Sequence, residues 1–269
     1  MNRIGFGVIL AATIGFCLQS TNIALGTSEK EIQKAYTDLT LADHWRKAKT
    51  ASDKLSALGE AALPTVLKGA KHEKRMVREY CYQILNSKFP KHKKSIQAII
   101  DGLNDKEPRI SYTCSFHLGE HRIARAKKAL ETCLKDKAKD NRTRYAAAKS
   151  LAELGHHETM VMLYIGLGSE DHYTRYLSNI GMKALCGKDL TDFGYQGPWE
   201  GAFVSGPVVG RVKGQPIEKA RRRLEHWQAI VKFLEWLEKE KPKLFKELDN
   251  LWKITARKRR CSRSGKPRG

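Results

Sequence analysis

Paired cysteine motifs are missing from this sequence of 269 residues. Its six cysteines form no Cys-x-x-Cys and no Cys-x-x-Cys-His. Removal of an N-terminal leader that contains Cys17 would leave five, an odd number. These features argue against a disulfide framework, a zinc ribbon and covalently attached haem.

Acidic residues are few compared with basic ones. The chain has 29 Asp and Glu against 50 Lys and Arg, a formal net charge of +21. Such an excess favours an acidic protein, a nucleic acid or another polyanion, or an anionic membrane surface as partner. The alternative is that most lysines only solvate the outer faces of helices.

Catalytic and cofactor motifs are also missing. We find no nucleophile beside a base, no convincing pair of carboxylates and no cofactor fingerprint. His156-His157-Glu158 does not match His-Glu-x-x-His. The sequence therefore predicts a protein that is not an enzyme, with no catalytic residues, no resident metal and no small-molecule cofactor.

Only one long apolar run occurs, and it lies at the N-terminus. Arg3 precedes the uncharged stretch 4–18, and Ala24-Leu25-Gly26 offers small residues at a cleavage site. Residues 1–26 are thus predicted to be a signal peptide, with an uncleaved N-terminal membrane anchor as the alternative. We expect an exported protein of the periplasm or the extracytoplasmic face.

The feature that is present throughout the middle of the chain is a repeat. Large apolar residues recur at steps of 30, 33, 33 and 31 residues, at Leu55, Leu85, Leu118, Leu151 and Met182. Four residues before each stands a small side chain, in order Ala51, Cys81, Cys114, Ala147 and Ser178. A period of this length is typical of stacked helical hairpins, so we expect these cysteines to be buried packing residues.

The hairpins can be placed along the chain from this register. After a first helical pair near 30–58, in which Trp45 and Leu55 should face inward, we expect helices at 60–71 with 74–88, 92–104 with 108–121, 124–137 with 141–154, and 157–168 with 172–186. Breaks are expected at Gly59, Pro90, Gly119, Gly155 and Gly187. The predicted fold is all-α, an α-solenoid of about five stacked helical hairpins over residues 27–187.

Several stretches resemble the HEAT-repeat superfamily over about residues 41–187. They are Leu58-Gly59-Glu60-Ala61-Ala62-Leu63-Pro64, Leu118-Gly119-Glu120, and the segment from Thr143 to Gly155. The segment 185–195 is similar to one in secreted planctomycete-type HEAT-repeat proteins. The resemblance implies a helical scaffold and no common reaction, although some HEAT-like folds are bilin lyases.

The last third of the chain changes character. Residues 188–215 are rich in glycine and proline and predict a loop anchored by Phe193, Tyr195 and Trp199. Residues 216–253 predict two capping helices, the first burying a stripe formed by Ile217, Ala220, Leu224, Trp227, Val231 and Leu234. Residues 254–269 predict a basic disordered tail that binds polyanions through Arg257, Lys258, Arg259, Arg260 and Arg263.

Arginine recurs at one position on the second helix in three of the five hairpins, with tyrosine beside it in the later ones, and these residues form the main candidate surface for a partner. The residues of this ridge are Arg78, Tyr112, Arg144, Tyr145, Arg175 and Tyr176. They could contact phosphates and stack on bases or sugars. The favoured alternative is structural: in the HEAT family this arginine pairs with an acid at the turn between the helices, which implies Asp140 and Asp171 here.

A second candidate is a zinc site from Cys114, His117 and His121, which share one helix face. We disfavour it because Cys114 already fills a packing position and His121 follows the expected break at Gly119. The sequence as a whole predicts a non-enzymatic protein-binding scaffold of the cell envelope. The alternative is a binder of nucleic acid or another polyanion.

Overall fold

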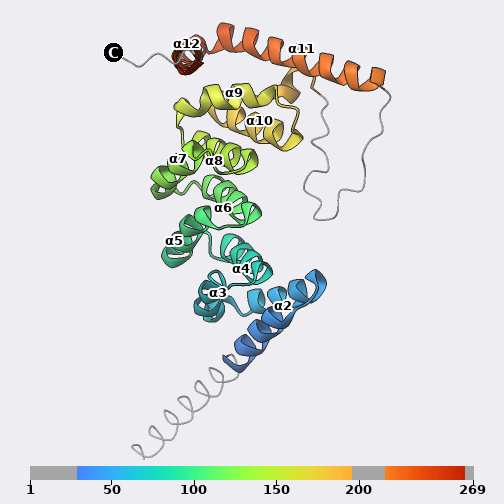
Figure 1. Cartoon of the computed structure of the whole chain (residues 1–269), viewed down its shortest axis with the longest axis vertical. Coiled ribbons are helices and arrows are strands. Elements are labelled where there is room, and N and C mark those ends of the chain that lie inside the picture. The colour runs from blue at the N-terminus through green and yellow to red at the C-terminus, as the bar shows by residue number, and fades with distance from the viewer. Residues whose placement is uncertain (1–28, 196–215, 264–269) are drawn as a thin grey trace, which may run out of the picture. The chain divides into compact units, whose positions relative to one another are not determined.

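The computed structural model describes residues 29–195 and 216–263, with side chains for 29–195 and 224–254 (Figure 1). Every regular element in these ranges is a helix, which confirms the all-α class. None of the described helices is long and apolar enough to cross a membrane. The predicted signal peptide and most of the predicted glycine-rich loop, with Trp199, lie outside the described residues.

The chain divides into two compact units, Met1–Ile110 and Ser111–Gly269, with the division inside α6 (Pro108–Glu120). Unit 1 contains a helical segment at residues 29–41, followed by α2 (Trp45–Ala57), α3 (Leu63–Gly69), α4 (Arg75–Lys88) and α5 (Lys93–Asp101). Unit 2 contains α7 (Lys127–Lys135), α8 (Asn141–Glu153), α9 (Met160–Leu167), α10 (His172–Cys186), α11 (Pro216–Glu240) and α12 (Pro242–Arg263). The predicted helix pairs are therefore confirmed, most of them within a few residues.

In unit 1, α4 packs against α2, α3 and α5. The repeat residues Leu55 and Leu85 are fully buried in this core. Trp45 is not, and the prediction that it faces inward was wrong: it is 57% exposed. Trp45 is the first residue of α2, and the inward position one turn later is filled by the buried Ala48.

In unit 2, α8 is the central helix and packs against α7, α9 and α10. The repeat residues Leu118, Leu151 and Met182 are all buried, as the register predicted. Small residues let the helices approach closely: a Cβ on Gly181 would come within 2.8 Å of Leu163. Gly166, which departs from the apolar pattern, is buried against Ser178 and the ring of Tyr145.

Gly119 is inside α6, so the expected helix break at this residue was wrong. A Cβ there would lie 2.4 Å from the Cα of Ser150 on α8, so this glycine serves close packing and not termination. The chain turns at Arg122 instead, which has a left-handed φ of 51°. Hydrogen bonds from Arg122 N to Gly119 O and from Ile123 N to Leu118 O close the helix end.

The C-terminal helices cap unit 2, as predicted, but α11 uses a different face. Residues Ala229, Ile230, Phe233 and Leu237 are buried in the core, whereas Leu224, Trp227 and Val231 are at least half exposed. Phe193 and Tyr195 do anchor the start of the loop: Phe193 meets Phe233 and Trp236, and Tyr195 meets His226. Both stripes of α11 are apolar, and the stripe that meets these anchors is the buried one.

The basic tail was expected to be disordered from residue 254, but α12 continues to Arg263. Alanine, arginine and lysine in this stretch are good helix formers. The positive charges of the arginine and lysine side chains also suit the negative C-terminal end of the helix dipole. The backbone of residues 254–263 is therefore helical.

Candidate functional site

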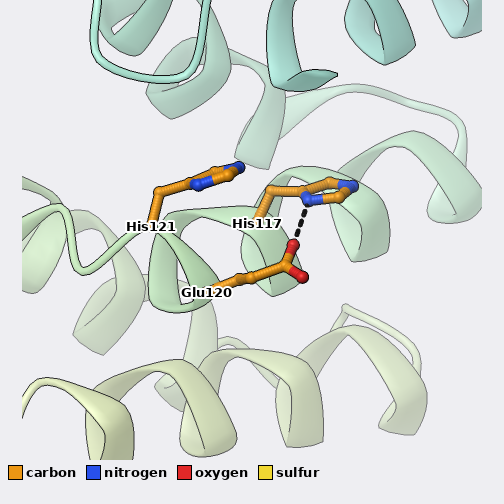
Figure 2. Close-up of side chains that lie close together, drawn as sticks. All are labelled: His117, Glu120 and His121. Atoms are coloured by element: carbon orange, nitrogen blue, oxygen red, sulfur yellow. Dashed lines mark hydrogen bonds and ion pairs between the residues drawn. The ribbon is translucent and has the colours of Figure 1, made fainter.

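Three side chains that can act as metal ligands lie close together at the C-terminal end of α6: His117, Glu120 and His121 (Figure 2). They lie at positions i, i+3 and i+4, so they share one side of the helix. One ligand atom from each lies within 4.8 Å of the other two. His117 Nδ1 donates a hydrogen bond to Glu120 Oε2 over 2.7 Å, and the two imidazoles stack with centroids 5.9 Å apart.

The backbone places these side chains. Because Gly119 continues the helix, His121 N bonds to His117 O over 3.0 Å, which puts the second histidine one turn beyond the first. The left-handed turn at Arg122 then ends the helix immediately after the cluster. The three side chains thus lie at a helix end, and solvent reaches them: the His117 side chain is 30% exposed and that of Glu120 50%.

A buried ion pair on α8 lies close to the cluster. Lys149 Nζ is 2.8 Å from Glu153 Oε2 and 3.7 Å from the centroid of the Phe116 ring. Burial lowers the pKa of Lys149 and raises that of Glu153, while their mutual attraction opposes both shifts. Since the two charges cancel, they leave Glu120 as the negative group next to the histidines.

Burial also lowers the pKa of His117, although its hydrogen bond to Glu120 acts in the opposite direction. A lowered pKa keeps this imidazole neutral near pH 7, which is the form that binds metals. Two imidazoles and one carboxylate, with access to water, can hold a transition metal. This is the one group of three or more potential metal ligands among the described side chains.

Glu120 was not among the zinc ligands considered from the sequence, which included Cys114 in its place. Cys114 is fully buried in its packing position, as expected for that position. The signal that could have found the site is the spacing of His117, Glu120 and His121, which was hidden by the expected break at Gly119.

Arg78, the first arginine of the predicted ridge, has a structural role. Its Nε and Nη2 donate to the two carboxylate oxygens of Asp105 over 2.7 and 3.0 Å. Its Nη1 donates to the carbonyls of His72 and Glu73, six and five residues earlier. The guanidinium is buried and makes these four hydrogen bonds within the fold, which indicates a structural role for Arg78.

Arg175 and Arg144 make similar bonds in later repeats. Arg175 Nη1 donates to the carbonyls of Ser169 and Glu170, again six and five residues earlier, and Arg144 Nε donates to Leu134 O. The expected acidic partners have other roles. Asp140 and Asp171 accept hydrogen bonds from the backbone amides of Thr143 and Thr174 and begin α8 and α10. The recurring arginine therefore satisfies carbonyls of the preceding turn.

The tyrosines of the ridge are half-buried. Tyr145 of α8 packs against Gly166 of α9 in the next hairpin, and Tyr112 lies next to Phe116. Burial raises the pKa of Tyr112 to about 12 and also raises that of Tyr176. Binding of a ligand by this ridge stays a prediction, as does binding by Arg257, Lys258, Arg259, Arg260 and Arg263, whose side chains lie outside the described part.

Successive helical hairpins, whose recurring large apolar residues are buried, define the chain as an α-solenoid. A comparison with protein families found a match to HEAT repeats over residues 96–180. This match and the helical fold both agree with the HEAT-repeat resemblance of the sequence. A comparison with curated proteins found no match.

Proposed function

We propose that this HEAT-repeat chain is a non-enzymatic scaffold that holds an acidic protein through basic turns between its repeats. HEAT repeats are generally scaffolds for protein interaction. The observation that carries the finer proposal is the clustering of exposed basic residues at two of these turns.

The first basic turn joins α4 to α5 in unit 1. It contains no acidic residue, and its four lysines are all exposed: Lys88, Lys91, Lys93 and Lys94. The second turn joins α6 to α7 in unit 2 and again has no acidic residue between 121 and 128. Its basic residues are exposed as well: Arg122, Arg125, Lys127 and Lys128. Each turn is a local concentration of positive charge that attracts an acidic surface and speeds its association.

The exposed face of α11 favours a protein over a polyanion as the partner. Leu224, Trp227 and Val231 lie at successive turns of one helix side and are 60%, 53% and 50% exposed. Protein interfaces combine aromatic and aliphatic anchors with a polar rim, whereas a phosphate backbone offers no apolar surface to such a face.

Charge reversal tests the basic turn directly. We expect Lys88→Glu/Lys91→Glu/Lys94→Glu to abolish retention of a protein that the wild-type chain captures from the native envelope fraction. The matched control is Lys30→Glu/Lys34→Glu/Lys54→Glu, which changes the net charge equally on exposed sites of the first helices. The captured protein must be acidic and must bind again as a purified component. Equal retention by both variants, or no specific retention at moderate salt, would contradict the proposal.

A salt titration separates the two kinds of partner. Binding to a polyanion weakens steeply and linearly with the logarithm of the salt concentration, because counterions are released. For an acidic protein that also contacts the apolar face of α11, we expect a shallower dependence and a loss of affinity in Trp227→Ser. A steep slope with unchanged affinity of Trp227→Ser would favour the polyanion.

The location of the protein belongs to the same proposal. Arg3, the apolar stretch 4–18 and Ala24-Leu25-Gly26 support export to the periplasm or the extracytoplasmic face. N-terminal sequencing of the protein from its native envelope fraction tests this, with Thr27 as the expected first residue. A mature chain that starts at residue 1 or 2 and stays with the membrane would support the anchor instead.

A further inference from the structure

We propose that His117, Glu120 and His121 form a zinc-binding site at the C-terminal end of α6. The site adjoins the second basic turn, since His121 directly precedes Arg122, and it uses none of the basic side chains or the exposed face of α11 on which the proposed function rests. Two imidazoles and one carboxylate are a ligand set that zinc enzymes use, whereas magnesium and calcium prefer oxygen ligands alone.

The geometry needs only side-chain adjustment. Zinc bonds of about 2.0–2.2 Å in a tetrahedron place neighbouring ligand atoms about 3.4 Å apart. The three ligand atoms already lie within 4.8 Å of one another, and two of them, His117 Nδ1 and Glu120 Oε2, are 2.7 Å apart. Zinc would replace the proton that now joins these two atoms, and this proton would be released to solvent.

The backbone around the site is fixed before any metal arrives. Gly119 packs against Ser150, and the hydrogen bonds of the turn at Arg122 hold the residues on both sides of His121. Preorganised ligands lose little conformational entropy on binding. The exposure of the His117 and Glu120 side chains leaves room for water as a fourth ligand.

The charges that face the site from α8 and α10 permit a cation, and the basic residues from Arg122 onward are exposed to solvent, which screens them. Lys149 is the positive group that faces the site from α8, and this charge is neutralised by Glu153 at 2.8 Å. Tyr176 of α10 lies near both glutamates and is uncharged at neutral pH. The order His-x-x-Glu-His is also used by one class of zinc peptidases to present two histidines to the metal. Here it supports binding alone, because no catalytic arrangement is assigned around it.

Titration of the full untagged chain with zinc chloride tests the proposal by calorimetry. We expect one equivalent of zinc at neutral pH, with affinity at least tenfold weaker in His121→Ala and in Glu120→Gln, since even outer ligand contacts contribute about 10–100-fold. The matched control is His92→Ala, because His92 is exposed and its side chain makes no cap bond. Its affinity should equal that of the wild type.

Cobalt(II) gives a readout that folding defects cannot imitate. Bound to nitrogen and oxygen ligands it shows weak visible bands, and it shows no intense thiolate charge-transfer band. We expect this spectrum in the wild type and in His92→Ala, and its loss in His121→Ala at unchanged far-ultraviolet circular dichroism. A thiolate band, zinc binding that His121→Ala leaves unchanged, or no binding at micromolar zinc would each overturn the proposal.

Discussion

At the residue scale, the end of α6 is unusual, because Gly119 lies inside the helix and the non-glycine Arg122 takes the left-handed position that ends it. Glycine is the common residue at the left-handed position that ends a helix. Gly155 holds this position after α8, with a φ of 84°, but Arg122 holds it after α6 with a φ of 51°. Gly119 is instead needed for contact with Ser150. The strain at Arg122 is local and can be measured.

We expect Arg122→Gly to stabilise the folded chain by about 0.5–1 kcal/mol. The left-handed conformation costs an L-residue about 1–2 kcal/mol, and glycine offsets part of this gain by its freer unfolded state. Urea unfolding at neutral pH gives the difference. The control is Arg122→Ala, which removes the same side chain but keeps the strain. If alanine stabilises as much as glycine, the effect comes from the lost charge and not from the backbone.

At the element scale, α8 contains a lysine that the repeat pattern does not explain. The Lys149 side chain is only 2% exposed and reaches Glu153, one turn later on the same helix. A buried pair of this kind contributes little net stability, but loss of one partner leaves a charge in a medium of low dielectric constant. The helix therefore depends on both residues together.

Glu153→Gln is expected to destabilise the chain by about 3 kcal/mol, near the lower limit for breaking a buried pair because Glu153 is partly exposed. The double variant Lys149→Met/Glu153→Leu should recover most of this loss, which a double-mutant cycle in urea measures. The matched control is the exposed pair of Lys49 and Asp53, also one helical turn apart. There, Asp53→Asn should cost only a few tenths of a kcal/mol. Similar costs for both pairs would show that burial is not the cause.

The aspartates that begin helical elements predict a loss of stability in acid. Burial alone would raise the pKa of Asp189, but hydrogen bonds from Lys183 and Thr191 outweigh it and hold the pKa below the ordinary value. A lowered folded-state pKa gives stability that is complete above the unfolded pKa of about 4 and is lost as the pH falls through the folded value. Unfolding free energies from pH 6 to 2 should therefore decrease below pH 4, and less steeply in Asp189→Asn. An unchanged slope in this variant would exclude Asp189 as a contributor.

Helix identity in α11 was predictable, but helix orientation was not. Pro216 and the apolar spacing correctly predicted a long capping helix from that residue. The spacing fits two overlapping stripes, however, and only tertiary contacts select Ile230 and Phe233 over Leu224 and Trp227. Periodicity describes one helix at a time and contains no information about the neighbour it meets.

At the scale of the whole molecule, the hairpin order could be predicted because each repeat brings the same packing demand. Leu85 and Leu151 hold equivalent repeat positions in different units and are buried for the same reason. Each repeat therefore gives independent support to the same helix positions. The candidate site has no such redundancy. Glu120 matters only beside His117 and His121 at one helix end, and a single occurrence has no pattern to reveal it.

The buried cysteines allow a prediction of how the chain unfolds. Four described cysteines are buried thiols outside any disulfide, one in unit 1 (Cys81) and three in unit 2 (Cys114, Cys133 and Cys186). Burial raises the pKa of Cys81 to about 12 and that of Cys186 to about 11, so the thiolates that react are scarce in the folded state. Labelling of these thiols therefore requires local or global unfolding.

In a solenoid, contacts are made mainly between neighbouring repeats, so the two units need not unfold together. Unit 2 has a cap of α11 and α12 that adds aromatic residues such as Phe233 to its core. We therefore expect Cys81 to be labelled at a lower urea concentration than Cys114, Cys133 and Cys186, in a pulsed alkylation experiment read by mass spectrometry. The variant Phe233→Ala provides the control, since it should shift the thiols of unit 2 toward the midpoint of Cys81. A single shared midpoint in the wild type would show that the chain unfolds as one cooperative body.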